Sequence, residues 1–200
     1  MRKLLLVAVL FIGTIVQMNA QEADKFRFDF DLGYAIPQGG GGGGVAFYLE
    51  PKWNIEDNMS VGLRFGGAAL VKNIEYSDNN QEAEAEVGVN GSYVGTYDYY
   101  FNDGSSSFAP FVGGGLGYYS VASVAIDGNS SGTADLEGSG KFGAMIRGGF
   151  NWAGFKMTLD YNIVGKSDLQ DFNGDVVGTT KNGYLGISLG FFVGGGKWGR

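Results

Sequence analysis

Phe26-Arg27-Phe28-Asp29-Phe30-Asp31-Leu32 alternates apolar and charged side chains along its whole length. A helix cannot gather these apolar residues on one face. A β-strand can, because successive side chains point to opposite faces of the pleat. In a soluble sandwich the apolar side would face the core, whereas in a transmembrane barrel it faces lipid and the charged side lines the lumen.

The same period of two recurs in eight segments that are separated by turn-rich stretches. These predicted strands are 26–36, 45–55, 59–71, 87–101, 108–122, 140–152, 155–164 and 183–193. The connections alternate between short (56–58, 102–107, 153–154) and long (38–44, 72–86, 123–139, 165–182). Short turns on one side and long loops outside the cell are typical of outer-membrane barrels. We therefore predict an all-β fold, an eight-stranded antiparallel up-and-down transmembrane β-barrel.

The N-terminus has the pattern of a secretory signal peptide. Arg2 and Lys3 precede an apolar run over 4–16, and Met18-Asn19-Ala20 supplies small or polar residues before a cleavage site. The run is shorter than the roughly 20 residues of a transmembrane helix. We predict a cleavable signal peptide at 1–20, an outer-membrane β-barrel domain at 21–200, and a location in the outer membrane. The chain has no cysteine for an acyl anchor or a disulfide.

The charge of the chain bears on its partners. Loss of Arg2 and Lys3 with the signal leaves 12 basic residues against 21 acidic ones, a net charge of −9. An acidic protein repels the phosphate backbone, so we expect no nucleic acid as a partner.

The faces opposite the apolar ones carry a balanced set of charges. Ions inside a lumen must be paired, because an isolated buried ion costs several kcal/mol. Arg147 and Asp160 are one candidate pair. The segment 108–119 fits two phases, so the count depends on register. The predicted lumenal charge network has five basic and five acidic residues: Arg27, Asp29, Asp31, Glu50, Lys52, Arg64, Asp98, Arg147, Lys156 and Asp160.

Six aromatic residues lie next to the predicted short turns, where the interfacial girdle of a barrel would sit. The alternative is ordinary strand propensity, since aromatic residues favour strands. Glycines within the strands, such as those at 113–115 and 117, would relieve crowding inside a narrow barrel. The six aromatic residues are Phe26, Trp53, Phe101, Phe108, Trp152 and Phe155.

Two segments, FAPFVGGGLGYY at 108–119 and GISLGFFVGGGK at 186–197, together with the signal peptide, resemble the small outer-membrane β-barrel family of OmpX, OmpW and the membrane domain of OmpA. The glycine-rich tail with its lysine is similar to versions from the Bacteroidetes. The resemblance covers the mature chain and implies the fold, the membrane and assembly by the barrel-insertion machinery. That family commonly ends on an aromatic residue, whereas Phe192 and Trp198 are followed by further residues here.

The chain lacks the usual catalytic groups. It has no histidine to act as a general base and no cysteine nucleophile. Asp29 and Asp31 are better explained as partners of lumenal cations. The run 171–175 places oxygen ligands at alternate positions, but its glycine and its twelfth residue, Asn182, do not fit an EF-hand. We expect no enzyme activity, no cofactor and no dedicated metal site, with weak divalent-cation binding by acidic outer loops as the alternative.

The predicted function is that of a non-enzymatic outer-membrane barrel with a side-chain-filled polar lumen and acidic extracellular loops, of which 73–86 is the most acidic. Its role would be structural or in surface interaction, with outer-membrane lipid, lipopolysaccharide or an unspecified surface ligand as partners. One alternative is a narrow transporter or channel for small molecules, hydrophobic ones included. A soluble lipocalin-like binder and an enzyme are the others, and both fit the sequence less well.

Overall fold

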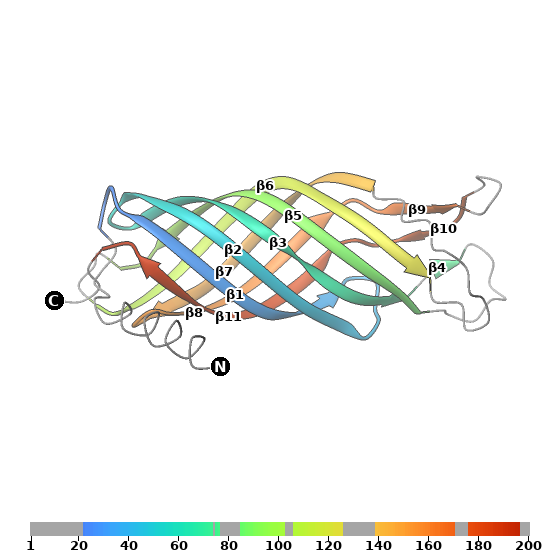
Figure 1. The fold of residues 1–200 in the computed structure, drawn as a ribbon, viewed down its shortest axis with the longest axis horizontal. Helices are drawn as coiled ribbons and strands as arrows, with labels where there is room; N and C mark the ends of the chain where they lie inside the picture. Colours follow the sequence, from blue (N-terminus) through green and yellow to red (C-terminus); the bar gives the residue numbers. More distant parts are fainter. Residues whose placement is uncertain are drawn as a thin grey trace, which may run out of the picture.

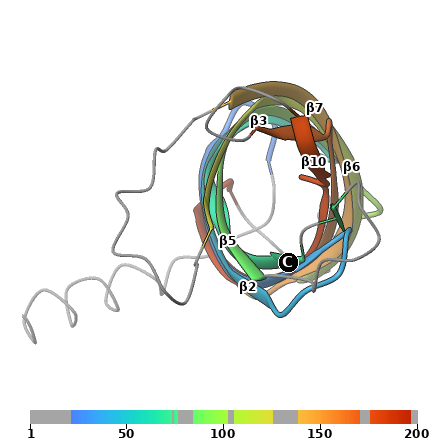
Figure 2. The same ribbon diagram turned by 90° about the vertical axis from the view of Figure 1, so that its right-hand side faces the viewer.

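The protein forms a closed β-barrel of eight antiparallel strands in the computed structural model, which describes residues 22–73, 75–76, 85–102, 106–125, 139–170 and 176–196 (Figures 1 and 2). Each barrel strand pairs with the next one along the chain, and the last pairs with the first. The strands are β1 (Phe26–Pro37), β2 (Gly43–Glu56), β3 (Met59–Asn73), β5 (Ala85–Tyr100), β6 (Phe108–Ala125), β7 (Ser139–Trp152), β8 (Phe155–Val164) and β11 (Tyr184–Gly194).

The predicted fold class is therefore confirmed, and every predicted strand end lies within three residues of the observed one. The predicted signal peptide at 1–20 lies outside the described residues. Across the described part of the chain, no helix has the length and apolar character needed to cross a membrane.

The turn between β7 and β8 consists of two residues. Ala153 has a φ of 47° and Gly154 a φ of 92°, so both residues adopt the left-handed conformation. Two-residue hairpins favour this geometry because its twist matches that of the flanking strands. The short turn thus fixes the register in which Trp152 faces Phe155.

A second, three-stranded sheet lies at the long-loop end of the barrel (Figure 1). It consists of β4 (Glu75–Tyr76), β9 (Ser167–Gln170) and β10 (Val176–Thr180), with β10 in the centre. The sequence prediction treated 72–86 and 165–182 as loops, and this was wrong for the residues that form these strands. Strands of two to five residues are too short to show alternation, so their pairing was not visible in the sequence.

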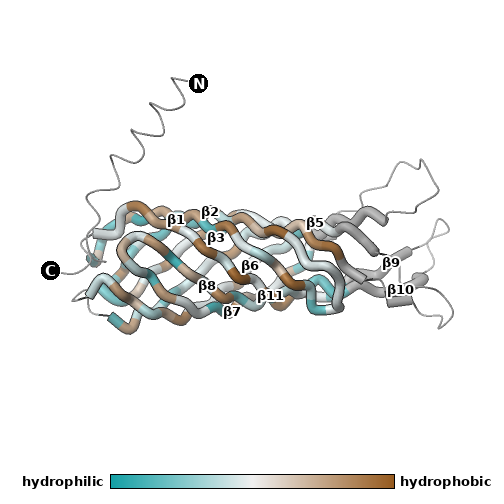
Figure 3. The backbone as a smooth tube through the Cα atoms, turned by 90° about the horizontal axis from the view of Figure 1, so that it is seen from below, coloured by the Kyte–Doolittle hydropathy of each residue, from teal (hydrophilic) through white to brown (hydrophobic). Residues whose placement is uncertain are grey.

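The side chains are distributed inside out relative to a soluble protein. Large apolar residues cover the outer wall, where Phe142, Leu189 and Leu32 are 72%, 67% and 66% exposed. Hydrophobic and hydrophilic residues alternate along the barrel strands (Figure 3). Charged side chains such as Arg27 and Glu50 are fully buried in the lumen. Soluble monomers rarely expose a contiguous apolar surface of this extent. The outer wall is therefore suited to hydrocarbon rather than to water.

The structure also shows which face of segment 108–119 points outward, which the sequence left undecided. Val112, Leu116 and Tyr118 face outward, whereas Phe111 and Tyr119 face the lumen. The six aromatic residues beside the short turns are all exposed, by 47% to 69%, as an interfacial girdle requires.

The outer wall gives a first prediction. Leu159 and Ile187 face each other in the β8–β11 register and are exposed near mid-strand. Leu159→Arg and Ile187→Arg should each lower the free energy of unfolding by about 2–4 kcal/mol, the penalty for a cation at the bilayer midplane. Urea titration of the barrel refolded in phospholipid vesicles measures this loss.

Phe155→Arg provides the control on the same face of β8. It lies beside the short turn, where the charge itself should cost only about 0–1 kcal/mol. Equal losses at positions 155 and 159 would contradict the assignment of the outer wall to the membrane.

Candidate functional site in the barrel lumen

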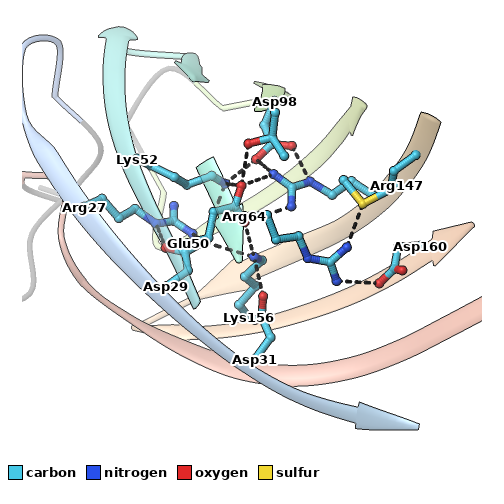
Figure 4. Close-up of polar contacts among 12 residues, drawn as sticks. Arg27, Asp29, Asp31, Glu50, Lys52, Arg64, Asp98, Arg147, Lys156 and Asp160 are labelled. Carbon is cyan, nitrogen blue, oxygen red and sulfur yellow. Dashed lines mark hydrogen bonds and ion pairs between the residues drawn. The ribbon is translucent and has the colours of Figure 1, made fainter. Parts of the chain in front are cut away.

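The structure places all ten predicted lumenal charges inside the barrel, and none is more than 5% exposed (Figure 4). Six strands contribute them, β1, β2, β3, β5, β7 and β8. They separate into two clusters that no ion pair joins among the described residues.

Arg147 is at the centre of the larger cluster. Its guanidinium reaches across the lumen from β7 and donates to Glu50 of β2 at 2.6 and 2.8 Å and to Asp98 of β5 at 2.7 and 2.8 Å. The Thr96 hydroxyl donates to Glu50 at 2.6 Å and completes the shell of that carboxylate. Such charge-assisted pairs are the strong class of hydrogen bond.

Two lysines extend the larger cluster. Lys156 Nζ donates to Asp29 at 3.0 Å and to Asp31 at 2.9 Å, and it lies 3.5 Å from Glu50. Lys52 donates to Asp98 and lies 3.5 Å from Asp29. Each ammonium group therefore has more than one carboxylate partner.

Arg27 ends the larger cluster toward the short turns. It forms a two-point pair with Asp29, at 2.5 and 2.8 Å, and its guanidinium lies 3.9 Å from the centre of the Phe192 ring. The eight residues comprise four cations and four anions, so the cluster is neutral by itself. Its members are Arg27, Asp29, Asp31, Glu50, Lys52, Asp98, Arg147 and Lys156.

The smaller cluster is the ion pair between Arg64 and Asp160, with an N–O distance of 3.0 Å. The Arg64 guanidinium also lies 3.5 Å from the centre of the Tyr48 ring. The suggested pairing of Arg147 with Asp160 is therefore wrong. The two residues are opposite each other in the β7–β8 register, but Arg147 extends across the lumen to other strands and leaves Asp160 to Arg64.

Glycines opposite the aspartates make room for the carboxylates, a relation that the sequence prediction missed. Gly113 faces Asp98 in register, Gly190 faces Asp31 and Gly186 faces Asp160. A Cβ atom at Gly113 would lie 2.0 Å from Asp98 Oδ1, and one at Gly190 would lie 2.2 Å from Asp31 Oδ1. A glycine on the neighbouring strand, at the paired position, was the sequence signal available for these contacts.

The first described residues of the chain lie across the short-turn end of the barrel. Asp24 N–H donates to the Asn54 carbonyl at 2.8 Å, and Asn54 N–H donates to the Lys25 carbonyl at 3.0 Å. The Asn54 side-chain amide donates to the carbonyls of Glu22 and Gly195, both at 3.0 Å. Asn54 thus ties the residues just before β1 and just after β11 to β2.

The described residues show no group of three or more histidine, cysteine, aspartate or glutamate side chains placed to hold a metal ion. The calcium-like run at 171–175 and residues 77–84 of the acidic loop lie outside the described residues. The chemistry that the lumen displays is charge compensation between side chains of the barrel itself.

No protein-family model matches the sequence, and a search of curated proteins finds no match. Solved structures do match. Neisserial surface protein A (NspA) aligns with a TM-score of 0.57 at 14% identity, over 84% of this chain and 95% of that one. The outer membrane protein OprG from Pseudomonas aeruginosa aligns with a TM-score of 0.55 at 11% identity, over 88% of this chain and 99% of that one.

The chain has the fold of the small outer-membrane β-barrels. The predicted resemblance to that family is confirmed for the fold. The similarity of the tail to Bacteroidetes versions stays a prediction, and residues 197–200 of that tail lie outside the described part of the chain.

The pairing within the larger cluster gives a second prediction. Arg147→Leu should cost about 3–5 kcal/mol, because it leaves Glu50 and Asp98 buried without their main partner. A second change, Glu50→Gln or Asp98→Asn, should recover part of this loss. Double-mutant cycles from urea unfolding in detergent micelles measure the coupling.

Asp160→Asn is the matched control for that cycle, because it neutralises a lumenal aspartate outside the cluster of Arg147. It should give no recovery and should add a loss of its own by leaving Arg64 unpaired. Rescue of Arg147→Leu by Asp160→Asn would refute the division into two clusters.

The glycine contacts give a third prediction. Gly113→Ala and Gly190→Ala should each lower the denaturant midpoint, because the new methyl group would clash with both a paired carboxylate and a backbone carbonyl oxygen of the neighbouring strand. Gly95→Ala is the control, since a Cβ there would meet only the Leu116 carbonyl oxygen, at 3.7 Å. Loss of the compact, fast-migrating band on unheated gels reports the same defect. An equal effect at all three positions would contradict the steric explanation.

Proposed function

We propose that this protein is a non-enzymatic integral outer-membrane β-barrel with a closed lumen, whose role is structural or in surface interaction. The observation that carries the proposal is the inside-out arrangement of an apolar outer wall around charge clusters that are each neutral. Removal from lipid would expose the wall to water, so the arrangement requires lipid, or a detergent that replaces it, around the barrel. The solved barrels of similar fold bear the names surface protein and outer membrane protein, which supports the same location.

The filled lumen argues against bulk transport. A barrel of eight strands is just wide enough for its own side chains. Here Arg147 spans from β7 to β2 and β5, and Lys156 spans from β8 to β1 and β2, so paired side chains cross the interior. Interactions with other molecules would therefore take place at the ends of the barrel rather than through it.

The long-loop end is the proposed site of interaction. The second sheet formed by β4, β9 and β10 extends the structure beyond the barrel at this end (Figure 1). β4 is part of the acidic segment 73–86, whose charge would favour cations or cation-bridged lipopolysaccharide. Export by a signal peptide at 1–20 and assembly by the barrel-insertion machinery complete the proposal. The absence of histidine and cysteine supports a role without catalysis.

Fractionation and conductance test the proposal together. The protein should be found in the outer membrane and should migrate as a heat-modifiable band. In planar bilayers it should give little or no steady ion conductance, because ion pairs occupy the lumen. Arg64→Ala combined with Arg147→Ala removes cations from both clusters and should destabilise the barrel or open a leak.

Each measurement has a result that would reject its part of the proposal. Recovery as a soluble monomer would refute the membrane location. Stable single-channel steps from the unmodified protein would refute the closed lumen and favour a narrow channel instead.

A further inference from the structure

A pocket opens at the short-turn end of the barrel. It has a volume of about 810 Å³ and is lined by residues 56–58 between β2 and β3 and by the facing ends of β5 and β6. Tyr100, which is 1% exposed, is part of the lining, and its hydroxyl accepts from Arg27 at 3.3 Å and from Lys52 at 3.2 Å. The pocket therefore lies beside the larger charge cluster.

The lining of the pocket is acidic and aromatic. Glu56 and Asp57 supply two carboxylates, and no described cation forms an ion pair with either. Tyr99, Phe101 and Phe108 supply aromatic rings. None of the described lining residues is basic. Such a surface favours cationic groups that accompany an aromatic ring, because both the carboxylates and the ring faces attract positive charge.

The chain that leaves β11 is directed toward this pocket. Gly194, Gly195 and Gly196 have φ values of 88°, 87° and 92°, which glycine adopts without strain, so the chain turns instead of continuing as a strand. The Gly195 N–H donates to the Phe26 carbonyl of β1 at 2.8 Å, and its carbonyl accepts from the Asn54 side chain of β2 at 3.0 Å. The path thus crosses β1 to β2, whose end borders the pocket.

The next segment has the reach and the chemistry to enter the pocket. It carries two cations around an aromatic ring, as Lys197, Trp198, Gly199 and Arg200. Four residues span at most about 14 Å. Glu56 follows Asn54 by two positions on β2, or about 7 Å. The pocket is therefore within reach of the segment 197–200.

We propose that the segment 197–200 binds in this pocket of its own chain, with Trp198 against the aromatic rings and the two cations near the carboxylates. The bound segment closes the short-turn end of the lumen beside Tyr100 and the larger charge cluster. The competing occupants are a second copy of the chain and a basic segment of another protein. This contact lies at the opposite end of the barrel from the long loops, so it does not depend on their role.

Disulfide formation measures where the segment lies, because the natural chain has no cysteine. Gly199→Cys is combined either with Asn58→Cys in the pocket or with Ala153→Cys in the β7–β8 turn. The second pair is the matched control, because Gly154 of that turn accepts from the Phe192 N–H of β11 at 3.0 Å and so lies beside the strand that the segment follows. In detergent micelles under mild oxidation, the link to position 58 should form about ten times faster, since binding raises the effective concentration of its thiols. Equal rates, or a faster link to position 153, would overturn the proposal.

Charge variants test what holds the segment. Glu56→Gln with Asp57→Asn should reduce the rate at position 58 to that of the control, and the new asparagine keeps an oxygen for the Ala23 N–H. Asp24→Asn should leave the rate unchanged, because Asp24 lies at the same end but outside the lining, and its φ of 61° suits asparagine. A preference for position 58 that survives loss of both carboxylates would refute binding through charge.

The same reactions separate the competing occupants. Disulfide-linked dimers in place of the internal link would assign the pocket to a second copy of the chain. Failure of both pairs to form a link, with cysteines that still react with a maleimide, would leave the pocket to another protein. Either result would overturn the proposal.

Discussion

The pairing of buried charges across the lumen is the constraint on which the structure depends. Backbone hydrogen bonds close the barrel around its circumference, whereas the ion pairs run across its interior. Arg147 connects β7 to β2 and β5, Lys156 connects β8 to β1 and β2, and Arg64 connects β3 to β8. An ion left without its partner in such an interior costs several kcal/mol. The cross-connections therefore tie together strands that share no backbone hydrogen bond.

The same constraint sets the register of the strands that carry these charges. Because the side-chain period is two, a slip of one residue would bring Arg27, Asp29 and Asp31 of β1 to the outer wall and the apolar residues between them into the lumen. Both changes are unfavourable. The first would place charged side chains in hydrocarbon, and the second would leave the lumenal ions of the other strands without their partners. The apolar wall and the charged interior are thus two results of one pattern, which explains how a chain without disulfides fixes its pairing.

Sequence alone predicted the eight barrel strands because each is at least ten residues long, enough for alternation to be seen. It also predicted which charges lie inside, because each follows from the phase of its own strand. The sequence did not predict which lumenal cation pairs with which carboxylate. Arg147 and Asp160 are adjacent in register, yet the long arginine side chain reaches strands beyond its neighbours, and that choice depends on the curvature of the closed barrel. The phase of 108–119 was ambiguous because glycines occupy both faces of β6.

In the lumen, the short anionic side chains lie at the wall and the long cationic side chains extend inward. Four of the five anions are the short aspartates, and Asp98, Asp31 and Asp160 each lie against a glycine of the neighbouring strand. Carboxylates held at the wall leave the axis to the long stems of lysine and arginine, which carry apolar carbon as well as charge. The cations therefore both neutralise the wall and fill the centre. An interior filled in this way leaves the surfaces beyond the membrane to meet other molecules.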